Sequence, residues 1–108
     1  MSFFDLFKGP DINDGINEMQ GKRNSVLLDV RTESEYREAH IPGSINIPLD
    51  KLQMVQNKIP EKGTSLYVYC LSGARSRQAV NFLKRFGYTD VNDLGGIRNY
   101  KGRIEKGA

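Results

Sequence analysis

The side chain best suited to nucleophilic chemistry in this sequence is Cys70, the only thiol among 108 residues. A short loop of mostly small residues follows it, made of Leu71, Ser72, Gly73, Ala74, Arg75 and Ser76. Small residues let backbone amides converge on an anion, and Arg75 adds a guanidinium near the end of the loop. We therefore expect the loop to stabilise a negatively charged sulfur at Cys70.

A buried structural role is the alternative for Cys70, because free cysteine is among the residue types found most often in protein cores. An inert cysteine, however, needs neither a glycine-containing loop nor an arginine beside it. A helix is expected from Ser76 onward, and the free amides and the dipole at a helix N-terminus favour negative charge. A reactive thiolate at neutral pH is therefore the prediction for Cys70.

Four short runs rich in aliphatic, β-branched and aromatic residues predict the strands that position this loop. These runs are Val26–Val30, Ser44–Ile47, Ser65–Tyr69 and a short stretch around Val91. The first run is almost continuously apolar, which is typical of a parallel sheet covered on both faces. It also contains Asp29, which is then expected to need a partner.

Helical patterns separate these runs, so strands and helices alternate along the chain. Thr32 and Glu35 have the spacing of a capping box, and Asp50 is placed to cap the third helix. His40 follows the second helix, where we expect a structural hydrogen-bonding role. The expected helices are Ile12–Met19, Glu33–Ala39, a helix after Asp50 that runs through Leu52 and Val55 and ends before Ile59, Ser76–Phe86 and Ile97–Glu105.

Length and composition indicate one α/β domain over residues 1–108, with residues 1–10 as an extension docked on it through phenylalanines. One cysteine and one histidine cannot build a familiar metal site, so neither a metal nor a cofactor is expected. A lone thiol also fits the reducing cytoplasm. The chain start lacks the features of a signal peptide, and no apolar run is long enough to span a membrane.

The net charge of +3 is unevenly spread, since residues 66–108 hold eight basic and three acidic residues. The excess is small and lacks interleaved exposed aromatics, which argues against nucleic acid as a partner. Attraction of a small anionic substrate is the preferred interpretation, and a solvated basic face is the alternative.

Four features in order resemble the rhodanese domains. They are the segment Asp29–Tyr36, the segment His40–Pro48 with its His-Ile-Pro-Gly sequence, the Cys70 loop, and the pair Gly95–Gly96. The resemblance extends from about Ile12 to the end of the chain. It implies a three-layer α/β fold with a central, mainly parallel sheet of about five strands flanked by helices.

The resemblance also implies a sulfurtransferase of the thiosulfate:acceptor class. Such enzymes take sulfane sulfur from an anionic donor such as thiosulfate, a persulfide or a polysulfide, and carry it as a persulfide on the residue matching Cys70. Leu71 to Ser76 would hold the substrate, with Arg75 on the anionic donor or leaving group. An internal brace from Arg75 to Asp29 or Glu35 is the alternative. The acceptor would be cyanide, a small thiol, thioredoxin or a sulfur-receiving protein.

Two other functions remain open from the residues. Cysteine phosphatases and arsenate reductases also place an arginine after the cysteine, but with five intervening residues, whereas Leu71 to Ala74 make only four. A non-enzymatic module that senses persulfide or redox state, or binds a partner, would look identical in sequence. Two departures from the family pattern are the lack of tryptophan and the apolar Leu71, which favours persulfide or polysulfide donors over thiosulfate.

Overall fold

The computed structural model describes residues 11–108, and the expected docking of residues 1–10 lies outside this range. Strands and helices alternate along the described chain, as the sequence predicts. In chain order the elements are α1 (Ile12–Gln20), β1 (Ser25–Asp29), α2 (Glu33–Glu38), β2 (Ile45–Asn46), the 3-10 helix η2 (Leu49–Met54), α3 (Val55–Lys58), β3 (Ser65–Cys70), α4 (Ala74–Arg85), β4 (Asp90–Gly96) and the 3-10 helix η3 (Ile97–Asn99).

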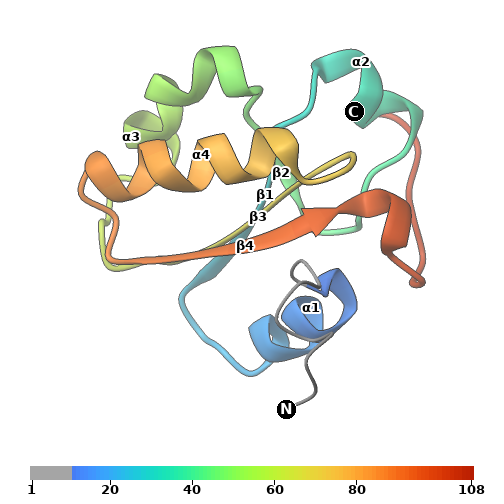
Figure 1. Cartoon of the computed structure of the whole chain (residues 1–108), viewed down its shortest axis with the longest axis horizontal. Coiled ribbons are helices and arrows are strands. Elements are labelled where there is room, and N and C mark those ends of the chain that lie inside the picture. The colour runs from blue at the N-terminus through green and yellow to red at the C-terminus, as the bar shows by residue number, and fades with distance from the viewer. Residues whose placement is uncertain (1–10) are drawn as a thin grey trace.

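The strands form one parallel sheet with the order β2-β1-β3-β4. The predicted α/β class with a parallel sheet is therefore confirmed. The described residues contribute four strands to the sheet, compared with the expectation of about five. β3 lies inside the sheet between β1 and β4, so the strand that ends at Cys70 has a neighbour on each side (Figure 1).

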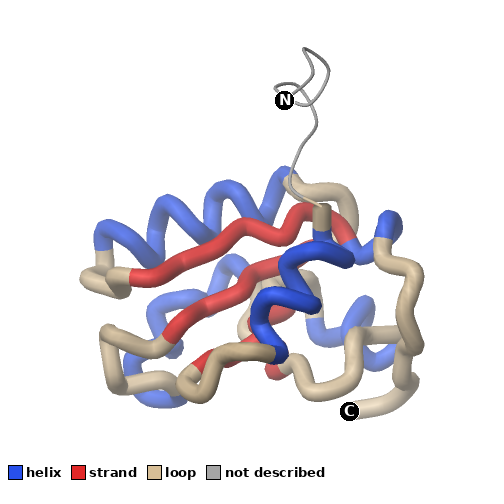
Figure 2. Tube along the Cα trace, turned by 90° about the horizontal axis from the view of Figure 1, so that it is seen from below, coloured by secondary structure: helices blue, strands red, loops and turns tan. Residues whose placement is uncertain are grey.

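Helices cover both faces of the sheet, which gives three layers (Figures 1 and 2). Side chains alternate between the faces along each strand. Leu28 and Val68 belong to a core cluster that also contains residues of α4, η2 and α3. Leu27 and Tyr67 belong to a second cluster on the opposite face, together with residues of α1. Cys70 is on the α4 side of the sheet.

The predicted helix starts are confirmed where a side chain caps the helix. The carboxylate of Asp11 accepts a hydrogen bond from the amide of Asn13 at the start of α1, at 2.9 Å. At α2, Thr32 and Glu35 form the capping box in both directions. These local bonds satisfy amides that a helix leaves free, so the start of each helix can be predicted from a few residues.

Two predicted helices differ from the structure. The third is present as η2 followed by α3, which ends at Lys58, before Ile59 as expected. Asp50 does not cap it, because the N-cap of η2 is Pro48, two residues earlier, and Lys51 has non-helical angles. The helix expected over Ile97–Glu105 is only the short η3. Beyond η3 the chain is extended and reaches the end of α2 (Figure 1).

This C-terminal segment pairs with the chain after α2. The amide of His40 donates to the carbonyl of Glu105, and the amide of Glu105 donates back, each at 2.8 Å. The amide of Gly107 donates to the carbonyl of Arg37 at 2.7 Å. Backbone pairing with a distant segment thus replaces the local helical bonds. Across residues 11–108, no helix has the length and apolar character needed to cross a membrane.

Candidate functional site

Cys70 lies at the carboxyl end of an inner parallel strand, the edge of such sheets where ligands usually bind. The residue is 1% exposed. Its Sγ accepts hydrogen bonds from the amide of Gly73 at 3.0 Å and from the amide of Ser76 at 3.2 Å. Two backbone donors therefore converge on the sulfur.

The sulfur atom takes the place of a helix cap. Gly73 is the N-cap residue of α4 and has no side chain to accept the amides of the first turn. Ser76 is the third residue of the helix, whose amide is usually bonded by an N-cap oxygen. Cys70 Sγ accepts that amide instead. The helix begins two residues earlier than expected, at Ala74, so its N-terminus lies directly on the sulfur.

Two glycines of β4 allow the loop to take this path. A Cβ at Gly96 would lie 2.2 Å from the carbonyl oxygen of Leu71 and 2.7 Å from the Cα of Ser72, so only glycine fits there. A register irregularity in the β3–β4 pairing places Gly95 opposite Tyr69 and Gly96 opposite Cys70. Gly95–Gly96, which the sequence singles out only through the family resemblance, is thus the surface against which the Cys loop packs.

Asp93 braces the loop and was not predicted from the sequence. Its Oδ1 accepts the hydroxyl of Ser76 at 2.7 Å and the amide of Gly95 at 2.9 Å. The Ser76 hydroxyl also lies 3.0 Å from the carbonyl oxygen of Gly73. One carboxylate therefore ties α4 to the irregular end of β4. The spacing Asp93-Leu94-Gly95 was the available signal, because aspartate often bonds the amide two residues further on.

Arg75 forms a two-pronged ion pair with Glu35. Its two terminal nitrogens donate to the two carboxylate oxygens at 2.6 and 3.0 Å. The hydrogen bonds from Arg75 lower the pKa of Glu35 from 4.5 to about 2, with Thr32 adding to the effect. The pKa of Arg75 is raised, first by Glu35 and to a smaller extent by attraction to Cys70 and Asp29. The brace that the sequence left open as an alternative is therefore present, and it holds α2 against the Cys loop.

Asp29 finds the partner it was expected to need in Arg31. The guanidinium of Arg31 lies 2.7 Å from Asp29 Oδ2 and 2.6 Å from the carbonyl oxygen of Ala39, and both charged residues are buried. Burial alone would lower the pKa of Arg31, but hydrogen bonds and attraction from Asp29 outweigh it and raise that pKa. His40 stacks on the ring of Tyr36, with Nδ1 2.8 Å from the Tyr36 carbonyl oxygen, which fits the structural role expected for it.

The remaining loop side chains point away from the sulfur. Leu71 is 43% exposed, and Ser72 and Ala74 are exposed as well. The loop therefore presents its backbone inward to Cys70 and its side chains outward. Among residues 11–108, no group of three or more potential ligands is arranged for a metal ion.

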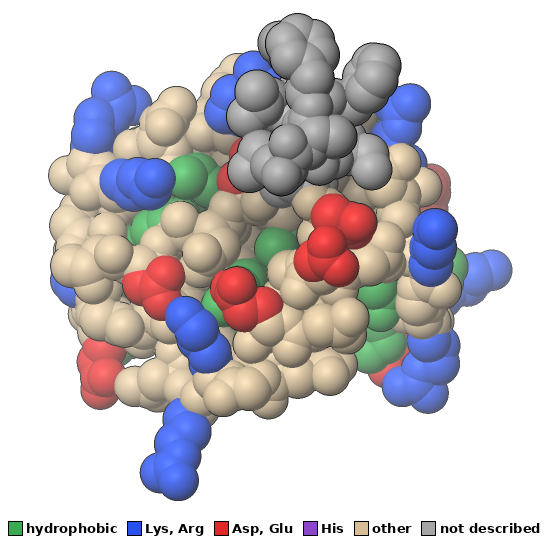
Figure 3. All heavy atoms as spheres, turned by 60° about the horizontal axis from the view of Figure 1, so that its bottom comes forward, with side chains coloured by type: hydrophobic (Ala, Val, Ile, Leu, Met, Phe, Trp, Pro, Cys, Tyr) green, Lys and Arg blue, Asp and Glu red, His purple; other side chains and the backbone are tan. Residues whose placement is uncertain are grey.

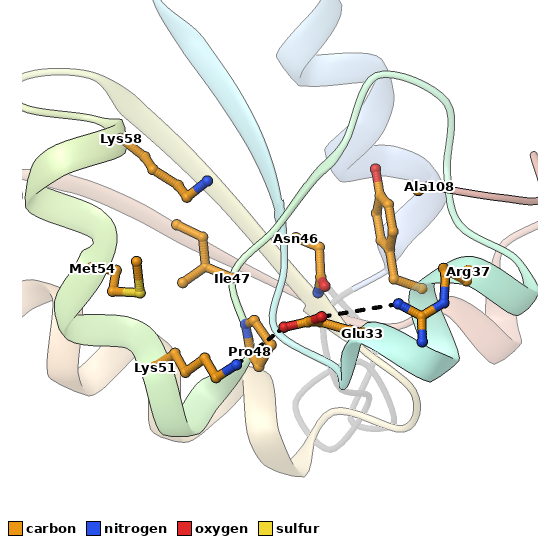
Figure 4. A pocket seen from close by; sticks show the side chains of 10 residues that line it. Glu33, Arg37, Asn46, Ile47, Pro48, Lys51, Met54, Lys58 and Ala108 are labelled. Carbon is orange, nitrogen blue, oxygen red and sulfur yellow. Dashed lines mark hydrogen bonds and ion pairs between the residues drawn. The ribbon is translucent and has the colours of Figure 1, made fainter.

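Two pockets lie near this region, and Cys70 lines neither. The larger, about 650 Å³, is bounded by the Cys loop at Ser72 and Gly73, the end of β4, the start of α1 and the segment from Arg98 to Lys101. The smaller, about 400 Å³, lies between α2 and η2. Figure 4 shows Glu33 at its centre, paired with Lys51 at 3.1 Å and with Arg37 at 3.9 Å. Only the larger pocket adjoins the loop.

The protein has a parallel sheet covered by helices and a cysteine at the N-terminus of one helix. Comparison with known protein families shows which family has this arrangement. A model of the rhodanese-like domain family matches residues 13–103. The chain belongs to the rhodanese-like family, as the sequence resemblance indicates.

Its relatives include proteins named for sulfur chemistry. The thiosulfate sulfurtransferase PspE of Escherichia coli is 37% identical over 73 residues, which cover 67% of this chain and 70% of that protein. The putative sulfur carrier protein YrkF of Bacillus subtilis is 39% identical over 80 residues, covering 73% of this chain and 43% of that protein. A structure described as rhodanese with anions from E. coli aligns with a TM-score of 0.72 at 34% identity, covering 77% of this chain and 99% of that one.

Proposed function

We propose that the protein is a sulfurtransferase that carries sulfane sulfur as a persulfide on Cys70. The observation that carries the proposal is the pair of amide donors, from Gly73 and Ser76, that converge on Cys70 Sγ at 3.0 and 3.2 Å. Preorganised backbone donors stabilise a charge that develops during a reaction without having to move at that moment. The names of the two curated relatives, a thiosulfate sulfurtransferase and a putative sulfur carrier, support the same chemistry.

The reaction takes place in two displacements. In the first, the Cys70 thiolate attacks the sulfane sulfur of the donor, and the bond between that sulfur and the rest of the donor breaks. The leaving group, sulfite from thiosulfate or a thiolate from a persulfide, takes the electron pair. In the second, an acceptor thiolate or cyanide attacks the outer sulfur and Cys70 leaves as a thiolate. Electrons balance within each displacement, so no external oxidant or reductant is needed.

Each part of the Cys loop has a place in this proposal. The loop backbone holds the thiolate, and then the persulfide, through the amides of Gly73 and Ser76. Arg75 contributes its positive charge next to Cys70 and holds the loop in place through Glu35. An arginine has five N–H donors, and Glu35 accepts from two nitrogens of Arg75. We therefore predict that the remaining N–H groups of Arg75 bind the donor.

The expected partners are a small anionic sulfur donor and a thiol acceptor. The free thiol of Cys70 must stay reduced to react, so a cytoplasmic setting remains part of the proposal. The exposed apolar side chain of Leu71 favours a persulfide or polysulfide donor over thiosulfate.

Mass spectrometry of the intact protein tests the proposal. After incubation with thiosulfate or glutathione persulfide, we expect a gain of one sulfur atom on Cys70 that is lost on adding dithiothreitol or cyanide. The Cys70→Ser variant is the control and should gain nothing. An unmodified wild-type protein after incubation with every donor would refute the transferase function and leave a partner-binding rhodanese module as the better hypothesis.

A further inference from the structure

The larger pocket, of about 650 Å³, has free positive charge beside the Cys loop. Three of its lining residues, Arg77, Arg98 and Lys101, are exposed. The ion pairs and side-chain hydrogen bonds found among residues 11–108 do not include the charged groups of these three residues. Their charges are therefore available to a ligand.

The carboxylates that line the same pocket are already engaged by the fold. Asp93 accepts the hydroxyl of Ser76 and the amide of Gly95 through one oxygen. Asp11 caps α1 through the amide of Asn13. On the face that Figure 3 shows, basic and acidic side chains are interspersed. A pocket whose carboxylates are occupied and whose cations are free favours an anionic ligand.

The position of the free cations sets a condition on that ligand. Arg75, the cation next to the sulfur, is bound to Glu35. Arg77 and Arg98 line the pocket, whereas Cys70 does not. A ligand that reacts at Cys70 and also uses these arginines must extend from the sulfur into the pocket and carry its negative charge on the part that lies there. Thiosulfate has no such extended part, because its charge lies on the terminal sulfur itself and on oxygens only two bonds away. The volume of about 650 Å³ also lies within the range of sites for small organic molecules, about 300–1,000 Å³.

We propose that this pocket binds the organic part of a low-molecular-weight persulfide that carries carboxylates, with Arg77 and Arg98 recognising the carboxylates. The inference rests on the proposed function and names the donor class. Gly73 lies between the pocket and the sulfur of Cys70, because it lines the pocket and its amide donates a hydrogen bond to Cys70 Sγ. It has no side chain to stand between the pocket and the sulfur.

The transfer step balances within this arrangement. The Cys70 thiolate attacks the outer sulfur of the bound persulfide, and a sulfur–sulfur bond forms between them. The bond inside the donor breaks, and its electron pair leaves with the inner sulfur as a thiolate. That thiolate stays in the pocket through its carboxylates until it takes a proton from water and dissociates.

A comparison of two donors tests the inference. Glutathione persulfide carries two carboxylates, and 2-mercaptoethanol persulfide carries none. The Arg77→Ala/Arg98→Ala variant should raise KM for glutathione persulfide about five- to tenfold, with kcat nearly unchanged. KM for 2-mercaptoethanol persulfide should change less than twofold. Added salt should raise KM for glutathione persulfide in the wild type and have little effect in the variant, because salt screens exposed charges.

The matched control is Lys84→Ala/Arg85→Ala, which removes two exposed cations from the opposite end of α4. It should leave KM for both donors at the wild-type value. Equal KM changes for the two donors, or an unchanged KM for glutathione persulfide, would overturn the inference. If the wild type accepts sulfur from no donor at all, the proposed function fails as well. The unfolding midpoint of each variant shows whether it is folded.

Discussion

Cys70 is at once the proposed nucleophile and the N-terminal cap of a helix. Its sulfur accepts amides that a serine, threonine or aspartate would accept elsewhere. The two roles need the same geometry, with an acceptor in line with the free amides of the first turn. A substitution at this position therefore affects stability as well as reactivity, and the two effects can be separated.

Comparing two substitutions of Cys70 tests the capping role. Cys70→Ser keeps an acceptor for the amides of Gly73 and Ser76, so we expect its free energy of unfolding to stay within about 1 kcal/mol of the wild type. Cys70→Ala leaves both amides without their partner in a buried place and should be less stable than the serine variant by about 1–2 kcal/mol. Urea unfolding followed by circular dichroism measures the difference. Equal stability of the two variants would show that the sulfur does not cap α4.

The ion pair between Arg75 and Glu35 predicts a pH dependence of stability. The pKa of Glu35 is about 2 in the folded protein and 4.5 ordinarily. A carboxylate whose pKa is lowered by folding stabilises the protein above its ordinary pKa, and this stabilisation is lost as the pH falls through the folded value. Both side chains are partly exposed, 33% and 27%, so the contribution is reduced to about 1 kcal/mol.

Glu35→Gln is the variant that isolates this contribution, because glutamine can also complete the capping box with Thr32. At pH 7 the wild type should be more stable than Glu35→Gln by about 1 kcal/mol. The difference should shrink between about pH 4.5 and pH 2, following the carboxyl group. Urea midpoints measured for both proteins at several pH values provide the check. A difference that is the same at pH 7 and pH 2.5 would contradict the assignment.

At the scale of elements, the close packing of β4 against the Cys loop predicts a strong effect of Gly96→Ala. The added Cβ would meet the backbone of Leu71 and Ser72 at 2.2 to 2.8 Å, and backbone cannot rotate away. We expect a loss of about 1–3 kcal/mol in stability, as for other overpacked sites, together with slower sulfur uptake at Cys70.

Gly63→Ala is the matched control for this substitution. A Cβ at Gly63 would have no atom within 4 Å, so the variant should keep the wild-type unfolding midpoint within error. If Gly96→Ala behaved like this control, the loop would have to be free to move away from β4, and Gly96 would not set its path.

Some elements follow from local sequence and others do not. Asp11, Thr32 and Glu35 act on residues two or three positions away, which is why the starts of α1 and α2 are predictable. The helix expected at Ile97–Glu105 does not form, because the apolar residues that suggested it do not share one buried face. Ile97 and Tyr100 pack against the α1 side of the sheet, whereas Ile104 is 48% exposed.

The candidate site shows the same division. Cys70 and its loop are contiguous, so their order and the glycine at position 73 are visible in the sequence. The partner of Arg75 comes from a helix 40 residues earlier, and that of Ser76 from a strand 17 residues later. Sequence alone offers several carboxylates for each of them, and only the packing of α2 and β4 around α4 selects Glu35 and Asp93.

At the scale of the whole molecule, the alternation of strands and helices and the almost continuously apolar first strand predict an α/β domain with a parallel sheet, and the resemblance to the rhodanese domains implies its three layers. Strands buried on both faces appear in the sequence as continuous apolar runs, such as Leu66–Tyr69 of β3. The pairing of the C-terminal segment with the chain after α2 was not predictable, because it depends on backbone groups that every residue has.

Removing residues 104–108 tests that pairing. The deletion takes away the two backbone hydrogen bonds between His40 and Glu105 and the one from Gly107 to Arg37. We expect a loss of about 1–3 kcal/mol in the free energy of unfolding and faster hydrogen exchange at the His40 amide. Glu105→Ala keeps the backbone bonds and loses only the contact with the His40 ring, so it should cost less than about 0.5 kcal/mol. A deletion that costs no more than Glu105→Ala would show that the segment does not hold the fold together.

The donors that surround Cys70 Sγ belong to the main chain, and this gives the site an unusual freedom to vary. The side chains of Leu71, Ser72 and Ala74 are exposed, so they can be exchanged without altering a single donor to the sulfur. A library randomised at these three positions would sample many donor preferences on one constant chemical core. Only proline at position 73 or 76 would remove a donor outright. The same cradle is therefore a scaffold on which new sulfur donors can be selected.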